Sequence, residues 1–161
     1  MKTLFILIGP KGAGKTYIGQ RIAAHTPIYF LAVEPIWLEY LAQPDPAQSG
    51  WDVVAATIEQ AFATHDRVMI ESLGAGAEFA QFYQTLQQRY GVKLIKVETH
   101  LITCADRVRD RDQALQIPVT EEAVWMYNKI AAQVQYDWDQ TINNNGPASD
   151  AEILQAVQAW L

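Results

Sequence analysis

A short apolar run that breaks into a glycine-rich loop constrains the fold of this chain most strongly. Residues 4–8 read LFILI, the continuous apolar pattern of a strand buried on both faces. Residues 9–16 follow as GPKGAGKT and match the spacing G-x-x-x-x-G-K-[ST]. Such a loop cradles a phosphate when a buried strand precedes it and a helix follows it. The sequence therefore predicts a strand, a phosphate-binding loop and a helix in immediate succession.

Each residue type in the loop has a physical role. Glycines let the backbone curl so that its N–H groups face an anion, and the helix N-terminus adds a partial positive charge. Lys15 is expected to reach the β- and γ-phosphates, and the Thr16 hydroxyl to help bind Mg²⁺. Lys11 occupies a variable position, where it either adds charge or is simply solvated. The loop residues predicted to contact the nucleotide are Gly9, Lys11, Gly12, Ala13, Gly14, Lys15 and Thr16.

Strand-like and helix-like segments alternate along the chain. Strand patterns occupy residues 4–8, 28–33, 68–70, 92–97 and, more weakly, 140–143. Helical patterns occupy residues 16–24, 36–42, 51–64, 78–90, 104–112, 121–136 and 150–161. This alternation predicts an α/β protein in which helices cover both faces of a parallel sheet. A length of 161 residues without linkers or repeats predicts a single domain over residues 1–161.

The charge balance and the single cysteine limit the partners and the compartment. Lys and Arg number 12 against 18 Asp and Glu, whereas nucleic-acid-binding domains usually carry a basic face. One cysteine, Cys104, allows no internal disulfide and indicates a reducing compartment. No apolar run approaches the ~20 residues of a membrane span. We expect a cytoplasmic protein with neither a nucleic-acid nor a membrane partner.

The loop, the chain length and the order of the elements resemble one group of P-loop NTPases. This group comprises the small-molecule and nucleotide kinases of the adenylate, shikimate and gluconate kinase type. The resemblance covers almost the whole chain and is most specific at the loop. It implies a three-layer α/β/α fold whose five-stranded parallel sheet has the order 2-3-1-4-5. It also implies ATP with Mg²⁺ as phosphoryl donor, an acceptor lobe at about residues 34–66 and a short lid at about residues 112–120.

Two carboxylates are expected beside the loop. Glu71 follows the strand pattern 68–70, as a Walker B acid follows its strand, although an ordinary surface residue is the alternative. Glu34 follows the pattern 28–33, where the related kinases often carry an acceptor-binding acid. Because ligands bind at the carboxyl ends of parallel strands, both acids should meet the loop at one edge. We favour Glu34 for the acceptor and Glu71 for the metal, and either could be the general base.

Arginines and an asparagine complete the predicted site. Arg107 and Arg111 have the R-x-x-x-R spacing that borders the lid in adenylate and gluconate kinases, where arginines meet the adenine and the phosphates. At helical spacing they would share one helix face, and arginine suits the charge that spreads over a transferring phosphoryl group. The alternative is a surface helix paired with its own aspartates. Asn144 lies where related kinases contact the adenine, and a plain turn is equally compatible.

The predicted acceptor lobe is free of basic residues. Residues 22–66 contain no lysine or arginine. Nucleoside monophosphate kinases and shikimate-type kinases hold the acidic group of their acceptors with arginines. We therefore predict a neutral or cationic acceptor with hydroxyls: a nucleoside, sugar, polyol or amino-bearing compound. Trp37 and Trp51 either stack on a ring of that acceptor or only pack the lobe.

Together these features predict an ATP- and Mg²⁺-dependent kinase that transfers the γ-phosphate to a hydroxyl of a small acceptor. The predicted catalytic residues are Lys15, Glu34, Glu71, Arg107 and Arg111. Besides the loop, Arg107 and Asn144 are predicted to bind the nucleotide, and Thr16 and Glu71 the metal. Two alternatives stay open. One is an NTPase without an acceptor, and the other is a non-catalytic nucleotide-binding module that acts on a protein partner.

Overall fold

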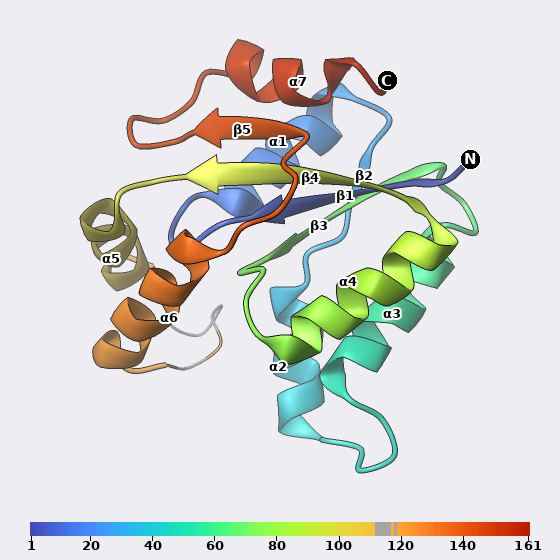
Figure 1. Ribbon diagram of the computed structural model, residues 1–161, viewed down its shortest axis with the longest axis horizontal. Helices are drawn as coiled ribbons and strands as arrows, with labels where there is room; N and C mark the ends of the chain where they lie inside the picture. The colour runs from blue at the N-terminus through green and yellow to red at the C-terminus, as the bar shows by residue number, and fades with distance from the viewer. Residues whose placement is uncertain (112–116, 118) are drawn as a thin grey trace.

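The computed structural model describes residues 1–111, 117 and 119–161 and contains a five-stranded parallel sheet. The strand order is β2-β3-β1-β4-β5, which confirms the predicted order (Figure 1). The strands are β1 (Thr3–Ile8), β2 (Tyr29–Phe30), β3 (Arg67–Ser72), β4 (Gly91–Glu98) and β5 (Gln140–Asn143).

The helices lie in the predicted segments, with shifts at their ends. They are α1 (Lys15–His25), α2 (Glu34–Ala42), α3 (Gly50–Ala61), α4 (Ala77–Arg89), α5 (Leu101–Arg109), α6 (Glu121–Gln133) and α7 (Asp150–Gln158). Thr120 caps α6 as predicted, because its hydroxyl accepts the Ala123 N–H at 3.1 Å. Reciprocal capping boxes that begin with Ser49 and Ser149 start α3 and α7.

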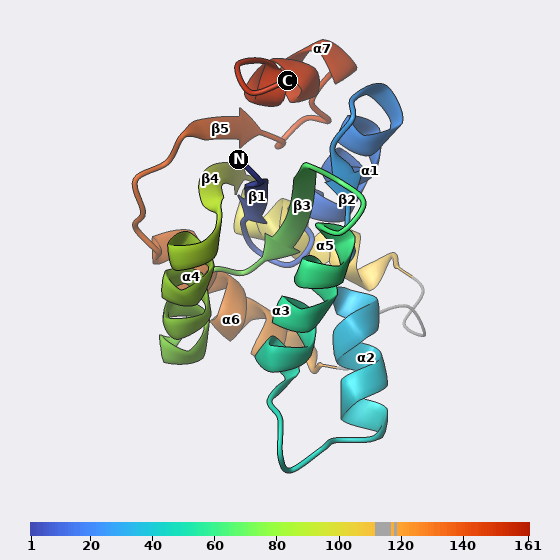
Figure 2. The same cartoon turned by 90° about the vertical axis from the view of Figure 1, so that its right-hand side faces the viewer.

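The central strand β1 explains why its sequence is a continuous apolar run. Residues Leu4 to Ile8 are completely buried. Alternate side chains enter opposite faces: Phe5 and Leu7 pack in the core beneath α1 and α7, and Leu4, Ile6 and Ile8 in the core beneath α3 and α4. Figures 1 and 2 show these two helix pairs on opposite sides of the sheet. Both faces of β1 are therefore covered, as in other parallel sheets.

The second strand is shorter than predicted, and this moves Glu34. Strand β2 contains Tyr29 and Phe30, and the Leu31 N–H still donates to the Met69 carbonyl of β3 at 2.8 Å, but the rest of the pattern 28–33 lies outside the strand. Glu34 is the first residue of α2 rather than a residue at a strand end. Pro35 favours this start, because a proline in the first turn of a helix loses no hydrogen bond and already has a helical φ.

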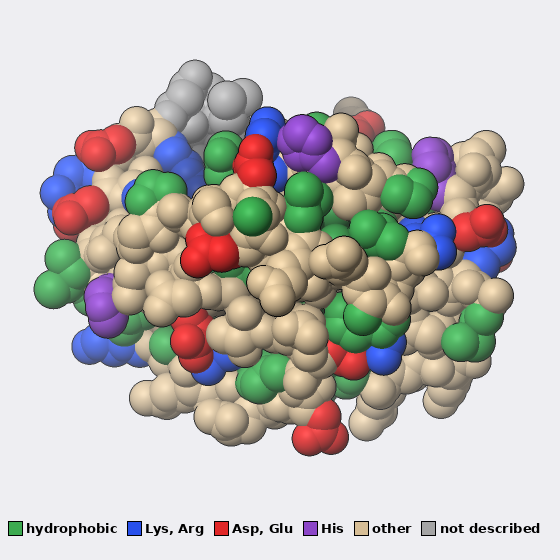
Figure 3. Space-filling view, turned by 90° about the horizontal axis from the view of Figure 1, so that it is seen from above, with side chains coloured by type: hydrophobic (Ala, Val, Ile, Leu, Met, Phe, Trp, Pro, Cys, Tyr) green, Lys and Arg blue, Asp and Glu red, His purple; other side chains and the backbone are tan. Residues whose placement is uncertain are grey.

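Charged side chains of both signs are spread over the α7 side of the molecule (Figure 3). Figure 3 views the α7 side of the molecule, where acidic and basic side chains are interspersed rather than gathered into a basic patch. Within the described ranges, no helix has both the length and the apolar character that a membrane span needs. Of the predicted lid, residues 112–116 and 118 lie outside the described residues.

Candidate functional site

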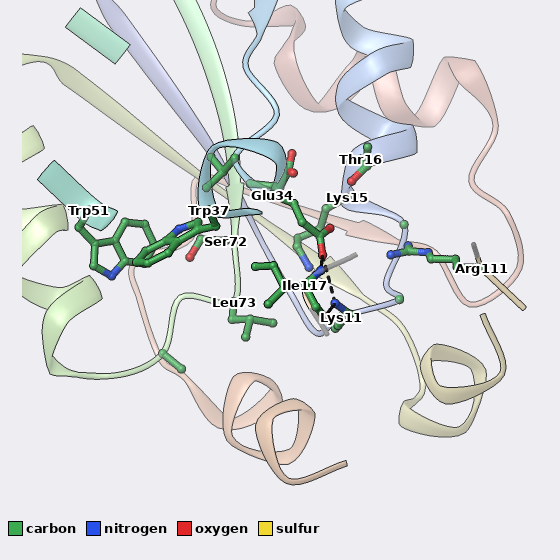
Figure 4. Close-up of a pocket in the computed structure, with 15 residues that line it drawn as sticks. Lys11, Lys15, Thr16, Glu34, Trp37, Trp51, Ser72, Leu73, Arg111 and Ile117 are labelled. Carbon is green, nitrogen blue, oxygen red and sulfur yellow. Dashed lines mark hydrogen bonds and ion pairs between the residues drawn. The ribbon is translucent and has the colours of Figure 1, made fainter. Parts of the chain in front are cut away.

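The glycine loop, the start of α2 and the end of β3 surround one cavity of about 240 Å³ (Figure 4). Glu71 is the next-to-last residue of β3 and pairs in register with Leu7 of β1, directly before the loop. The cavity therefore lies at the carboxyl ends of the strands, where open parallel sheets bind their ligands. The predicted site residues that line it are Lys11, Gly12, Gly14, Lys15, Thr16, Glu34, Glu71 and Arg111.

The loop has the backbone shape of an anion cradle. Gly12 and Gly14 have φ values of +87° and +96°, which L side chains rarely adopt. Within the loop, the Ala13 N–H donates to the Pro10 carbonyl at 3.1 Å, and Lys15 begins α1 directly after Gly14. Alternation of right- and left-handed residues before a helix N-terminus turns successive N–H groups toward one point. This geometry suits a phosphate group.

Lys15 is buried and folded back onto the loop. Its Nζ donates to the carbonyls of Gly9 at 2.7 Å and Pro10 at 2.8 Å. Burial lowers the pKa of this amine from 10.5 to about 8, and the nearby Glu71 carboxylate partly opposes that shift. An anion beside Lys15 would raise the pKa again, because it favours the charged form. The amine is therefore better matched to a phosphate-loaded loop than to an empty one.

Glu71 is a buried acid with an unused oxygen. The residue is 7 % exposed, and its Oε2 has no hydrogen-bond partner within the described part of the chain. Burial raises the pKa of the carboxyl from 4.5 to about 7, against the opposing effect of the Lys15 charge. Buried polar atoms are normally paired, so an unpaired carboxylate oxygen on a residue that lines a cavity marks Glu71 as a candidate functional residue.

Glu34 is held by the loop across the cavity. Its Oε1 accepts from Lys11 Nζ at 3.1 Å and from the backbone N–H of Ile117 at 3.0 Å. The dashed lines in Figure 4 mark hydrogen bonds among Glu34, Lys11 and Ile117. The Lys11 side chain is 17 % exposed, so the expectation of a simply solvated lysine is wrong. Lys11 instead neutralises Glu34 and joins the loop to the first turn of α2.

The two predicted arginines occupy different environments. Helix α5 ends at Arg109, so Arg111 lies beyond it, and the prediction that Arg107 and Arg111 share one helix face is wrong. Arg111 lines the cavity. Arg107 instead donates to carbonyl oxygens of the loop and of the turn after β5. These carbonyls are those of Asn144 at 2.8 Å and of Gly12, Ala13 and Asn145 at 3.3 Å each.

Asn144 also supports the loop. It is 4 % exposed; its Nδ2 donates to the Ala13 carbonyl at 2.7 Å, and its Oδ1 accepts the Ala148 N–H at 2.9 Å. The Thr99 hydroxyl donates to the same Ala13 carbonyl at 3.1 Å. In this structure the Asn144 amide therefore fixes the loop to the segment before α7. Its predicted contact with adenine stays a prediction.

Sequence reasoning missed Asn128, which clamps the other end of the loop. This α6 residue is 1 % exposed. Its Oδ1 accepts the Lys11 N–H at 2.8 Å, and its Nδ2 donates to the Lys11 carbonyl at 2.9 Å. The signal was an asparagine spaced as a member of the buried face of α6, between Val124 and Ala131. A buried amide at such a position needs partners, and here the partner is the loop backbone.

Comparisons with protein-family models and with curated protein sequences find no match. Solved structures match nearly the whole chain. A putative kinase from Chloroflexus aurantiacus has a TM-score of 0.71 and 15 % identity over 99 % of this chain and 98 % of that one. A sugar kinase from Janibacter has a TM-score of 0.64 and 11 % identity over 99 % of this chain and 94 % of that one. Shikimate kinase from Acinetobacter baumannii, in complex with shikimate, has a TM-score of 0.60 and 19 % identity over 99 % of this chain and 94 % of that one.

The chain has the P-loop kinase fold. At these identities the likeness establishes the fold and leaves the acceptor to be argued from the residues of this chain.

The site has donor groups that fit a magnesium nucleotide. The Thr16 hydroxyl and the unpaired Glu71 Oε2 both belong to residues that line the cavity. Across residues 1–111, 117 and 119–161, no cluster of three or more His, Cys, Asp or Glu side chains is suited to hold a metal ion. Mg²⁺ is commonly bound through one or two protein oxygens together with substrate phosphates. The residues present fit that arrangement.

Loss of the Asn128 clamp should weaken nucleotide binding. Asn128→Leu leaves the Lys11 N–H and carbonyl unpaired, and each unmade buried bond costs about 1–3 kcal/mol. We expect the Kd for a non-hydrolysable ATP analogue with Mg²⁺ to rise by about tenfold or more, measured by titration calorimetry. Gln133→Leu, on an exposed position of the same helix, is the matched control. An unchanged Kd in Asn128→Leu would show that the clamp does not shape the loop.

Replacement of Glu71 should stabilise the ligand-free protein above neutral pH. The folded pKa of about 7 exceeds the usual 4.5, so between these values the folded state keeps a proton that the unfolded chain has lost. Stability therefore falls as pH rises through this window. Glu71→Gln removes that penalty, so denaturant unfolding near pH 8 should show a gain on the order of 2 kcal/mol, shrinking towards pH 5.

The exposed substitution Glu39→Gln serves as the control for this stability measurement. It should change the free energy of unfolding little at either pH, because an exposed carboxylate has almost the same surroundings in the folded and unfolded chain. A Glu71→Gln variant that is less stable than the parent protein near pH 8 would contradict the prediction.

Proposed function

We propose that this protein is an ATP- and Mg²⁺-dependent small-molecule kinase. It transfers the γ-phosphate to a hydroxyl of a small neutral or cationic acceptor. The observation that carries the proposal is the presence of a buried lysine and a buried, partly unsatisfied carboxylate in one cavity beside the glycine loop. Lys15 and Glu71 shift each other's pKa and line one cavity. Such coupled, desolvated groups are concentrated at functional sites.

In the proposed reaction, the loop backbone and Lys15 hold the triphosphate. Thr16 and Glu71 would hold Mg²⁺, which supplies positive charge to the phosphates. The acceptor oxygen forms a bond to the γ-phosphorus as the bond from that phosphorus to the β,γ-bridging oxygen breaks, and its electron pair stays with ADP. The hydroxyl proton passes to a carboxylate of Glu34 or Glu71. Arg111 and Lys15 offset the charge that develops on the transferring group.

The acceptor class follows from where the cations lie. Those that line the cavity are Lys11, Lys15 and Arg111. Lys11 and Lys15 belong to the loop, and Lys11 is paired with Glu34. The acceptor lobe, residues 34–66, has no lysine or arginine of its own. Because the proposed reaction assigns Lys15 and Arg111 to the transferring phosphoryl group, a phosphate or carboxylate on the acceptor would lack the charge-assisted hydrogen bonds that such groups need in a partly apolar cavity.

A second candidate, an NTPase without an acceptor, is favoured by one observation. The unpaired Oε2 of Glu71, on a carboxyl whose pKa is about 7, has the properties of a base that polarises water near neutral pH. In that case Glu71→Gln would abolish a hydrolysis rate that no added compound stimulates. The kinase proposal requires the rate to depend on an acceptor.

The proposed function is tested by ADP release from Mg²⁺–ATP with and without a panel of hydroxyl compounds. The panel contains nucleosides, sugars, polyols, amino alcohols, a nucleoside monophosphate and shikimate. At least one uncharged or cationic compound should raise the rate by about tenfold or more over the basal hydrolysis. Lys15→Ala should lower the stimulated rate by about 100-fold or more, since it removes a cation from the transferring phosphate.

Lys129→Ala, an exposed lysine on α6, is the matched control and should leave the rate unchanged. Stimulation only by the monophosphate or by shikimate would keep the kinase and refute the acceptor class. A basal rate that no compound stimulates and that Glu71→Gln abolishes would favour the NTPase. Loss of only the acceptor-dependent rate in Glu34→Gln would assign the acceptor hydroxyl to Glu34.

A further inference from the structure

Two tryptophans form a corner in the wall of the cavity. Trp37 of α2 and Trp51 of α3 both line it, with ring centroids 5.3 Å apart and ring planes at 83°. Figure 4 shows them on one side of the cavity, with Thr16 and Arg111 on the other. The tryptophan corner therefore lies away from the phosphate end of the cavity. The body of an acceptor would be placed at this corner.

The tryptophan corner is fixed by its surroundings. Trp51 packs on Phe82 with centroids 4.6 Å apart at 34°, and Trp37 meets Tyr40 edge-on at 5.8 Å. Residue 50 is glycine, and a Cβ at this position would overlap the Trp37 ring. The close approach of α3 to Trp37 thus depends on the absence of a side chain. A wall held in this way is pre-organised, so a ligand does not have to order it on binding.

Four of the five charged residues that line the cavity have a neighbour of opposite charge, and the fifth, Arg111, lies at the phosphate end. Glu34 is paired with Lys11, and the carboxyl of Glu71 interacts with the buried amine of Lys15. Most of the other lining residues are apolar (Val33, Leu73, Ala75 and Ile117), and the Ser72 hydroxyl, labelled beside Trp37 in Figure 4, accepts the Gly74 N–H at 3.0 Å. At the tryptophan end, a charged acceptor would have to displace Lys11 from Glu34 or enter an apolar wall, and burial of an unpaired charge is costly. An uncharged acceptor meets neither penalty.

We infer that the acceptor is an uncharged hydroxyl compound that carries a flat unsaturated ring, and that this ring lies against Trp37 and Trp51. Two indoles at a right angle offer one ring face and one ring edge to the same guest, the two contacts that aromatic rings prefer. The hydroxyl of the guest then faces Glu34 and Glu71. This inference rests on the proposed function for the fate of the hydroxyl, whereas recognition of the ring requires only binding.

Matched pairs of compounds test the inference, because each pair shares its sugar and differs in the ring. The pairs are adenosine with methyl β-D-ribofuranoside, and phenyl β-D-glucopyranoside with methyl β-D-glucopyranoside. Each is titrated by calorimetry into the whole protein saturated with Mg²⁺ and a non-hydrolysable ATP analogue. In at least one pair the ring-bearing member should bind about tenfold more tightly, the expected effect of one stacked ring.

Variants show whether the tryptophan corner causes this preference. Trp37→Leu and Trp51→Leu should each remove most of it, while the Kd of the ATP analogue stays unchanged as evidence of a folded site. Tyr127→Leu, an exposed aromatic on α6, is the control and should retain the preference. Phenyl β-D-glucuronide and AMP, the anionic counterparts of the two ring-bearing probes, should bind more weakly than those probes.

Several results would overturn the inference. These are equal binding within both pairs, no binding of either ring-bearing probe, a preference that survives in both tryptophan variants, or tighter binding of the anionic counterparts. Failure of the proposed function is a separate outcome. A ring preference that depends on Trp37, without any phosphate transfer from ATP, would support the ring site and refute the kinase. Phosphorylation of only those compounds that lack a flat unsaturated ring would support the kinase and refute the ring site.

Discussion

The structure of the site depends on hydrogen bonds that hold the outer side of the glycine loop. The Ala13 carbonyl accepts from Asn144, Thr99 and Arg107, and the Lys11 backbone is clamped by Asn128. These four side chains come from segments far along the chain, so the loop shape is a product of the whole fold. Because glycine-rich backbone has high conformational entropy, a loop without such supports would lose much of its pre-organisation. The cavity and its charges are arranged around this fixed loop.

The protein alone stabilises the buried charges of Lys15 and Glu71 poorly, and a bound ligand could stabilise them better. Lys15 has a lowered pKa and Glu71 a raised pKa, and burial is the largest cause of both shifts. Neither residue is in its most favourable state in the ligand-free protein, so each carries a stability penalty. A phosphate beside Lys15 and a cation or hydroxyl beside Glu71 would relieve these penalties. The same desolvation that destabilises the empty site therefore adds to the affinity for a ligand.

Much of this fold could be predicted from local sequence patterns, and the site only in part. The run at residues 4–8 and the GPKGAGKT loop specify a buried strand and an anion cradle through residues that are adjacent in sequence. Glu34 was displaced from a strand end because Pro35 starts a helix there. The loop contacts of Arg107 and Asn128 join residues about a hundred positions apart, and no local pattern encodes them. The Lys11–Glu34 pair was missed for the same reason, since it depends on how α2 approaches the loop.

The fate of the γ-phosphate tests the central claim most directly. ³¹P NMR of Mg²⁺–ATP incubated with the protein and an acceptor that accelerates ADP formation distinguishes a phosphate ester from inorganic phosphate. A kinase site predicts a new phosphomonoester signal that grows in step with ADP, with Lys15→Ala abolishing both. ADP that accumulates only with inorganic phosphate, whatever acceptor is present, would contradict the account and assign the buried Glu71 to water activation.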